Sequence, residues 1–147
     1  MVEFREALQS DVPAVVALLQ DDVLGKGRES DDHARYQAMW REIDRDPNNA
    51  LIVGCRERVI IACYQLTIIP GFTLNATRRA EIEGVRVACR MRGQGIGKLL
   101  IADAEARARD AGAGLLQLAM NRTRGDALRF YEANGFEASH YGFKKQL

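Results

Sequence analysis

A strand, a glycine-rich turn and a helix follow one another between residues 81 and 100, and this succession constrains the fold more than any other stretch. Residues 82–88 alternate β-branched and polar side chains, which is typical of a strand, whereas 98–111 are rich in helix-forming residues. The turn between them carries Gly93, Gly95 and Gly97. Glycines remove the Cβ atoms that keep a ligand off the backbone, and the first amides of a helix lack partners. The stretch therefore predicts a phosphate site at a helix N-terminus.

Two common phosphate-binding patterns do not fit this turn. The dinucleotide pattern G-x-G-x-x-G, started at Gly93, requires a glycine where the chain has Lys98. The P-loop pattern requires Ser or Thr at the position of Leu99 and a glycine at the position of Arg92. Both classes of nucleotide site are therefore excluded.

The turn resembles the acetyl-CoA motif of the GNAT superfamily of N-acetyltransferases, which is written R/Q-x-x-G-x-G/A and lies between an apolar strand and a helix. Arg92, Gly95 and Gly97 match it position by position. Residues 127–136, ALRFYEANGF, resemble the family's second signature, a helix that ends A-x-x-F-Y-x-x-x-G-F, and Asn121 precedes them as the family's Asn does. Because both motifs occur in the family's order, the chain as a whole resembles a GNAT acetyltransferase.

Composition indicates one globular domain over residues 1–147. The chain is 47% hydrophobic and 28% charged, and a chain of this length buries roughly 70% of its unfolded surface. A net charge of +1 without a basic block gives no case for a nucleic-acid partner. The charged N-terminus and the lack of an apolar run near about 18 residues predict neither a secretory signal nor a membrane partner.

The cysteines and histidines predict no metal. Cys55, Cys63 and Cys89 are an odd set without C-x-x-C spacing, which favours reduced thiols in a cytoplasmic protein. His33 and His140 lie far apart and have no second ligand at metal spacing. Cys89 stands where members of the resembled family often carry Pro, and we expect this to alter only the exit of the strand.

The remaining pattern predicts an α/β arrangement. The predicted order is β-α-α-β-β-β-α-β-α-β-β, with 21–29 as a loop and 72–79 as a polar connection. The last two strands are predicted within 136–147. The resemblance implies a GNAT-like mixed, mostly antiparallel sheet of six to seven strands, flanked by about four helices and splayed at the central strands.

The resemblance also implies acetyl-CoA as co-substrate. In the family, the acetyl carbonyl and the pantetheine arm pair with the backbone of the central strand, and the pyrophosphate lies on the amides of the turn. Asn121 matches the residue that contacts the pantetheine. The strand edge corresponds to Val85, Arg86 and Val87, and the turn to Arg92, Gly93, Gln94, Gly95, Ile96, Gly97 and Lys98.

Acetyl transfer to an amine requires a polarised carbonyl, a deprotonated amine and a proton for the leaving thiolate. Tyr131 matches the family tyrosine whose hydroxyl points at the CoA sulfur, so it is the candidate general acid; the alternative is core packing beside Phe130. Glu81 and Glu83 share one face of the central strand. Either is a candidate general base acting through water, with a slight preference for Glu83, and the alternative for both is substrate binding or a solvated edge.

The acceptor is the least constrained part of the function. The resemblance implies a primary amine of a small molecule or peptide, and a homodimer is common in the family. Five carboxylates near the presumed acceptor site predict a small cationic amine, or else serve helix ends and solvent. These residues are Asp21, Asp22, Glu29, Asp31 and Asp32.

A second class of function stays open at this point, because a fold does not fix a function. GNAT-like domains also serve as acyl-CoA-binding sensors or as dimeric interaction modules with little catalytic activity. The presence of Asn121, Tyr131 and the strand glutamates favours the enzyme.

Overall fold

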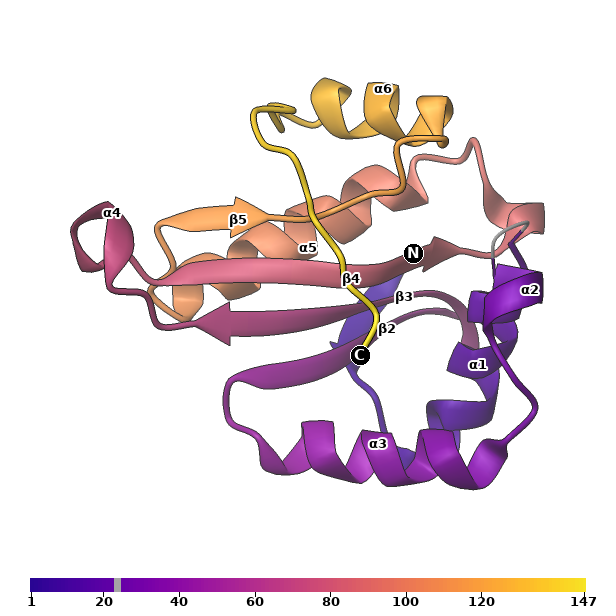
Figure 1. The fold of residues 1–147 in the computed structure, drawn as a ribbon. Coiled ribbons are helices and arrows are strands. Elements are labelled where there is room, and N and C mark those ends of the chain that lie inside the picture. The colour runs from indigo at the N-terminus through magenta and orange to yellow at the C-terminus, as the bar shows by residue number, and fades with distance from the viewer. Residues whose placement is uncertain (23–24) are drawn as a thin grey trace.

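An open sheet forms the centre of the protein, which the computed structural model describes over residues 1–22 and 25–147. Within these residues the sheet has five strands in the order β1-β2-β3-β4-β5 (Figure 1). The first four pair antiparallel, and β5 pairs parallel to β4. The sheet is therefore mixed and mostly antiparallel, as the resemblance implied. The strands are β1 (Glu3–Glu6), β2 (Asn49–Arg56), β3 (Val59–Ile69), β4 (Arg79–Val87) and β5 (Leu115–Gln117).

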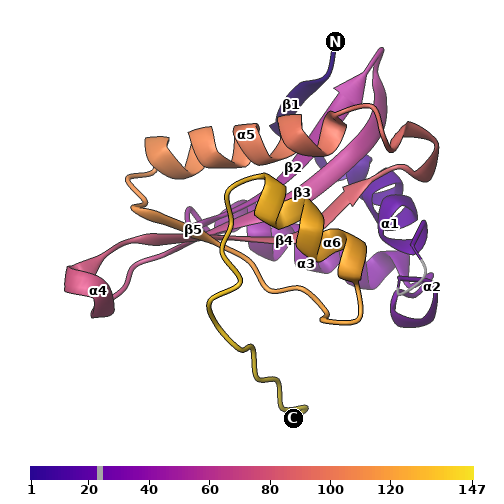
Figure 2. The same cartoon turned by 90° about the horizontal axis from the view of Figure 1, so that it is seen from above.

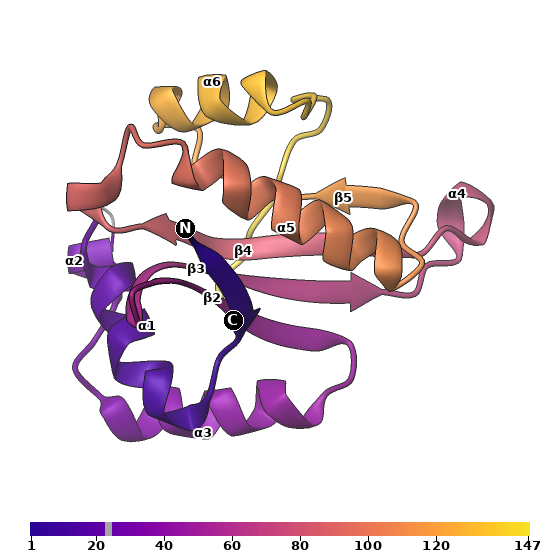
Figure 3. The same ribbon diagram turned by 180° about the vertical axis from the view of Figure 1, so that it is seen from behind.

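Helices cover both faces of the sheet. One long helix, α5, runs across β4 and is seen in front of it in Figure 3. On the other face α1 packs on β3 and α3 packs on β2. The helices of the described residues are α1 (Val12–Gln20), α2 (Gly25–Arg28), α3 (His33–Arg45), α4 (Thr73–Ala76), α5 (Ile96–Asp110) and α6 (Gly125–Ala133).

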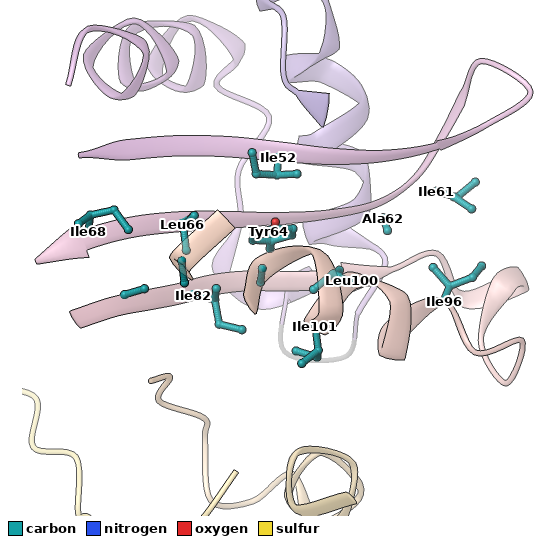
Figure 4. Packing of buried hydrophobic residues seen from close by; sticks show 13 residues of the cluster. Ile52, Ile61, Ala62, Tyr64, Leu66, Ile68, Ile82, Ile96, Leu100 and Ile101 are labelled. Atoms are coloured by element: carbon teal, nitrogen blue, oxygen red, sulfur yellow. The ribbon is translucent and has the colours of Figure 1, made fainter. Parts of the chain in front are cut away.

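The hydrophobic core has two parts, one on each face, because neighbouring residues of a strand point to opposite faces. Tyr64 of β3, Ile82 of β4 and Leu100 of α5 are buried in the larger part, which lies under α5 (Figure 4). Cys63, next to Tyr64 in the chain, points to the smaller part under α1 together with Val53. β3 thus contributes side chains to both parts of the core, one under α5 and the other under α1.

A β-bulge interrupts β4. Gln65 of β3 lies opposite Glu83, and Cys63 lies opposite Arg86. β4 therefore has one residue more than β3 over this stretch, and the extra residue is accommodated where Gly84 has φ +59°. A glycine with positive φ is the usual residue at such a bulge.

The bulge changes which residues of β4 face α5. Before it, Ile82 is buried under α5, and after it Val85 and Val87 pack against the same cluster. Arg86 consequently points to the α1 face, beside its cross-strand neighbour Cys63. The polar side chains that share this face of β4 are Glu81, Glu83 and Arg86.

Two short helices stand where the sequence predicts irregular chain. In the predicted loop 21–29, backbone bonds from Lys26 to Asp22 and from Glu29 to Gly25 close one turn as α2; residues 23 and 24 of that loop lie outside the described residues. In the predicted connection 72–79, α4 forms as an irregular turn in which Leu74 and Asn75 have positive φ. A single turn is too short to display a hydrophobic period, so the pattern does not reveal it. Over the described residues six α-helices are present rather than about four, besides the short 3-10 helices η1 (Gln9–Asp11) and η2 (Cys89–Met91).

The prediction of two short strands in 136–147 is wrong. This segment, all of it described, contains no strand. It crosses in front of the sheet in Figure 1 and ends away from the helices in Figure 2. Tyr141 and Phe143 are exposed along it. We attribute the difference to β5, because an edge of three residues offers little backbone to a further strand. The described chain therefore has five strands rather than six to seven.

Candidate active site

The turn before α5 has the backbone that a phosphate site needs. Gly93 has φ +75° and Gly95, which precedes α5, has φ +77°. Side chains disfavour this left-handed conformation, whereas glycine adopts it readily. A Cβ on either glycine would meet no described atom within 4 Å. The space beside these two glycines is therefore open, and the first amides of α5, at Ile96, Gly97 and Lys98, have no partner within the helix, as at an anion site.

Arg92 and Gln94 flank the amides of this turn. The Nε of Arg92 donates to the carbonyl of Val87 at 3.3 Å, which holds the guanidinium beside the end of β4. Gln94 is fixed from two sides, since its amide donates to the Arg90 carbonyl at 3.4 Å and accepts from Arg56 at 3.2 Å. The turn thus carries positive charge as well as free amides.

β5 pairs with only the first part of β4. Their pairing ends with Glu81 opposite Gln117. No other described strand pairs on that side of β4, so its backbone is open from the bulge onward. Val85, Arg86 and Val87 lie on this open edge, as the predicted splay requires.

Tyr131 lies on α6 and packs against the core under α5. Its ring meets Phe130 and Phe136 edge-on, with centroids 5.2 and 5.7 Å away. Burial raises the pKa of Tyr131 above its ordinary value, while the guanidinium groups of Arg124 and Arg86 act in the opposite direction. The hydroxyl therefore keeps its proton at neutral pH, as a general acid must. The ring also packs against the core, as the alternative predicted, and the role of Tyr131 as general acid stays a prediction.

The two candidate bases differ in their surroundings. Glu81 is half-buried and accepts a hydrogen bond from the Gln117 amide at 2.6 Å. Gln117 in turn accepts from Arg79 at 3.4 Å. Glu83 is exposed and has no hydrogen-bond partner among the described residues. Sequence reasoning missed Gln117, because the register of a parallel pair leaves no local signal in the chain.

Asn121 stabilises the turn that leads into α6. Its side-chain oxygen accepts from the amide and the hydroxyl of Thr123, at 3.0 and 2.7 Å. Its carbonyl accepts from the amide of Arg124 at 3.0 Å. These bonds form a turn of the kind that Asn favours. The contact of Asn121 with a pantetheine arm stays a prediction.

Asp22, Arg86 and Arg124 form a charged cluster that joins the end of α1, β4 and the start of α6. Asp22 pairs with Arg86 at 3.5 Å and with Arg124 at 3.3 Å. Asp22 and Arg86 are both buried. Sequence reasoning did not bring these residues together, because about a hundred positions separate Asp22 from Arg124 and neither lies in a motif.

The five carboxylates predicted as an acidic rim are occupied in other ways. Each has a partner within the fold, so these carboxylates also have structural roles, and the cationic amine drawn in by an acidic rim stays a prediction. Asp21 accepts from the Cys89 amide, Asp22 pairs with two arginines, Glu29 accepts from the Tyr36 hydroxyl, Asp31 from the Gln20 amide and Asp32 from the Arg35 amide.

The described residues contain neither a metal-binding cluster nor a helix that could span a membrane. Over residues 1–22 and 25–147, no three His, Cys, Asp or Glu side chains gather closely enough to hold a metal ion. Among the helices of the same residues, none combines the length and apolarity needed to cross a bilayer. Cys55, Cys63 and Cys89 are free thiols, and burial raises the pKa of Cys63 to about 12.

Comparison with known proteins agrees with this geometry. Residues 12–136 match the Acetyltransferase (GNAT) family. A relative from Salmonella typhimurium, named aminoalkylphosphonate N-acetyltransferase, is 34% identical over 99% of this chain and 91% of its own. A crystal structure from Bacillus halodurans C-125, named a transcriptional regulator, is 43% identical over the whole of both chains, with a TM-score of 0.96. An aminoglycoside N-acetyltransferase in complex with CoA, at 16% identity, shares the fold with a TM-score of 0.83 over 100% of this chain and 95% of that one.

The chain belongs to the GNAT family of acetyltransferases. It is an N-acetyltransferase that uses acetyl-CoA, which confirms the predicted enzyme class and co-substrate. Family membership favours the enzyme over the sensor or interaction module that the sequence alone left open.

Proposed function

We propose that the chain acts as one domain over residues 1–147 and moves the acetyl group directly from acetyl-CoA to a primary amine of a small molecule. One observation carries this proposal. The half-buried Tyr131 of α6, whose hydroxyl retains its proton, packs against the same cluster as Val85 of β4, a strand whose backbone edge is open. The hydroxyl supplies the proton and the strand edge supplies the amides that transfer requires.

Acetyl-CoA binds along this edge in our proposal. The pyrophosphate lies on the amides of residues 93–98 and near the guanidinium of Arg92. The pantetheine arm runs along Val85, Arg86 and Val87, and Asn121 contacts it from the loop before α6. The positive φ of Gly93 and Gly95 and the open space beside them support this arrangement.

Two side chains are sufficient for the proton transfers of the proposed reaction. The amine nitrogen attacks the thioester carbonyl, so that a C–N bond forms and the C–S bond breaks. The proton of the amine passes through water to a strand glutamate, and the leaving thiolate takes the proton of Tyr131. We propose Glu83 as the base, because Glu81 already accepts a hydrogen bond from Gln117.

Separate Glu83→Gln and Glu81→Gln variants test the choice of base. The pH dependence of kcat/KM reports the pKa of the essential base in the free enzyme. We expect Glu83→Gln to remove the acidic limb of the profile and Glu81→Gln to keep it. The reverse result assigns the base to Glu81, and an unchanged limb in both removes both glutamates from this role.

The acceptor class is tested with a panel of amines. Aminoalkylphosphonates come first, because a relative carries that name; alkylamines, amino acids and peptide N-termini complete the panel. The purified protein is given acetyl-CoA and each amine, and released thiol is measured. Turnover with any amine supports the proposal, whereas tight CoA binding without turnover across the panel contradicts it.

The cytoplasmic location, the homodimer and the lack of nucleic-acid or membrane partners stay proposals. Light scattering of the purified protein over a range of concentrations measures the oligomeric state, and a mass of one chain throughout would contradict the homodimer.

A further inference from the structure

The charged cluster of Asp22, Arg86 and Arg124 contains more positive than negative charge. Two guanidinium groups share one carboxylate, at 3.5 and 3.3 Å. Charge-assisted hydrogen bonds between such groups are normally about 2.7–2.9 Å long. Both pairs are therefore loose, and neither guanidinium is engaged through its full fork of donors.

Burial makes this imbalance significant. The side chains of Asp22 and Arg86 are each only 7% exposed. The Nε of Arg86 and the Oδ2 of Asp22 have no hydrogen-bond partner among the described residues. A buried guanidinium needs compensation by charge and hydrogen bonds. The Val85 carbonyl, which accepts from the Nη1 of Arg86 at 2.8 Å, and the shared carboxylate of Asp22 supply part of it. The two guanidinium groups still carry one positive charge more than Asp22 balances, so a second anion is favoured at this place.

Arg124 gives such an anion access. Its side chain is 34% exposed while it pairs with Asp22. The remaining N–H groups of its guanidinium can therefore meet a ligand from solvent. Planar guanidinium groups bind carboxylate, phosphate and phosphonate oxygens in pairs, which makes arginine the residue of choice for oxyanions.

The cluster lies next to the proposed reaction site. Arg124 is the residue just before α6, the helix that carries Tyr131, and Arg86 lies on β4. Both guanidinium groups oppose the rise in the pKa of Tyr131 that burial causes. Arg86 also shares a face of β4 with Glu81 and Glu83. An oxyanion at the cluster and an amine near the base would thus fit within one small molecule.

We infer that Arg86 and Arg124, positioned by Asp22, form a subsite for an oxyanion carried by the acceptor amine. The inference rests on the proposed acetyl transfer to a small amine, and it assigns the acceptor class: an amino group joined by a short alkyl chain to a phosphonate, phosphate or carboxylate. Arg86 and Arg124 are then specificity-determining residues, and Asp22 is a positioning residue.

Kinetics with matched acceptors test the inference. The oxyanion-bearing acceptors are 2-aminoethylphosphonate, 2-aminoethyl phosphate and 3-aminopropanoate. Propylamine, an alkylamine of similar size without an oxyanion, is the control acceptor. We expect Arg124→Gln to raise KM for the best oxyanion-bearing amine by roughly tenfold or more. KM for propylamine and for acetyl-CoA should change less than about twofold, since neither uses the subsite. Arg124→Lys should raise this KM less than Arg124→Gln does, because lysine keeps the positive charge but lacks the paired N–H donors of a guanidinium.

Arg122→Gln is the matched control. Arg122 is an exposed arginine of the same loop and has no ion pair among the described residues, so its loss should leave all of these constants unchanged. An equal loss for propylamine and the oxyanion-bearing amines would show that Arg124 only holds the fold. A rise confined to the KM of acetyl-CoA would assign the cluster to CoA phosphates. Either result overturns the inference.

Calorimetry separates this inference from the proposed function. Methylphosphonate is titrated into wild type and Arg124→Gln, each with CoA bound. Binding to wild type that is lost in the variant supports the subsite even if no amine in the panel is acetylated. No binding to wild type at millimolar concentration overturns it even if an amine is acetylated.

Discussion

Gly97 at the start of α5 and Phe130 of α6 lie in direct contact: a Cβ on Gly97 would come within 3.0 Å of two carbons of the Phe130 ring. The neighbour of Phe130 in the chain is Tyr131, and the two rings meet edge-on. The proposed pyrophosphate turn and the proposed general acid are therefore joined through a single close packing contact.

Gly97→Ala should disturb both sites through this contact. The added methyl group must displace the Phe130 ring, and overpacking of this kind costs roughly 1–3 kcal/mol. We expect a raised KM for acetyl-CoA together with a lower kcat, measured by thiol release. Leu99→Ala, a change of an exposed residue in the same helix turn, is the control. A Gly97→Ala enzyme with wild-type constants would show that α6 adjusts freely.

Gly95→Ala tests the conformation of the turn instead of its packing. Gly95 has φ +77°, and no described atom lies within 4 Å of a Cβ placed there. The expected loss is therefore backbone strain of about 1–2 kcal/mol. Gly95→Asn should be milder, because Asn tolerates this region better than Ala. Chemical denaturation of both variants measures the difference, and equal stability of the two would contradict the explanation.

Tyr131→Phe should lower kcat by about 100- to 10,000-fold, the usual contribution of a general acid or base. Stability should change little, since the ring and its packing remain. The pKa of Tyr131 is raised above its ordinary value of about 10, so the hydroxyl is protonated whenever the pH is below about 10. The acid form is lost only as pH rises through the raised pKa. A wild-type loss of kcat well below pH 10 would thus belong to another group, and unchanged kcat in the variant would exclude Tyr131 as the acid.

Tyr64→Phe should destabilise the fold without touching the site. The Tyr64 hydroxyl on β3 donates to Asp103 of α5, and Arg107 binds the same carboxylate at 2.8 Å while also donating to the Phe4 carbonyl at 3.2 Å. Removing one donor from this part-buried group costs about 1–3 kcal/mol.

The pH dependence of this variant checks its explanation. Burial and the neighbouring carboxylate raise the pKa of Tyr64. The stabilisation is therefore fully present below the unfolded pKa of about 10 and is lost as pH rises through the folded pKa. The stability gap between wild type and Tyr64→Phe should be constant from neutral pH to about 9 and narrow only in strong alkali. A gap that closes near neutral pH would point to a different cause.

Asp22→Asn should be among the most destabilising single changes at the charged cluster. It leaves Arg86 buried without a counter-ion, and breaking a buried pair in this way typically costs about 3–5 kcal/mol. Asp21→Asn is the matched control, because Asp21 is exposed and accepts a backbone amide. Thermal unfolding of the two variants should differ by several degrees, and equal midpoints would show that the cluster is not structurally coupled.

Local patterns were sufficient for the strand, turn and helix around residues 81–100. The glycines predicted the turn, which Gly93 and Gly95 form with positive φ, and the β-branched runs predicted β2, β3 and β4. The pattern could not show that β5 ends after three residues, because strand length depends on its partner. This is why the tail strands are mispredicted.

Long-range relationships in the site were also beyond the sequence. Tyr131 could be assigned from its motif, since the motif is local. The pairing of Asp22 with Arg86 and Arg124, and of Gln117 with Glu81, depends on how distant segments meet. The carboxylates at 21 and 22 therefore looked free in the sequence and are engaged in the fold.

The bulge at Gly84 makes the spacing between Glu83 and Arg86 as important as their identities. Because β4 carries one residue more than β3 there, a side chain that simple alternation would send under α5 is presented to the acceptor side instead. If the same residues paired in regular alternation without the bulge, the strand would keep every proposed functional group. It would nevertheless turn the Arg86 guanidinium into the hydrocarbon interior and expose Val85 or Val87 in its place. In this strand a one-residue bulge therefore decides whether Arg86 lies on the proposed acceptor side or in the core.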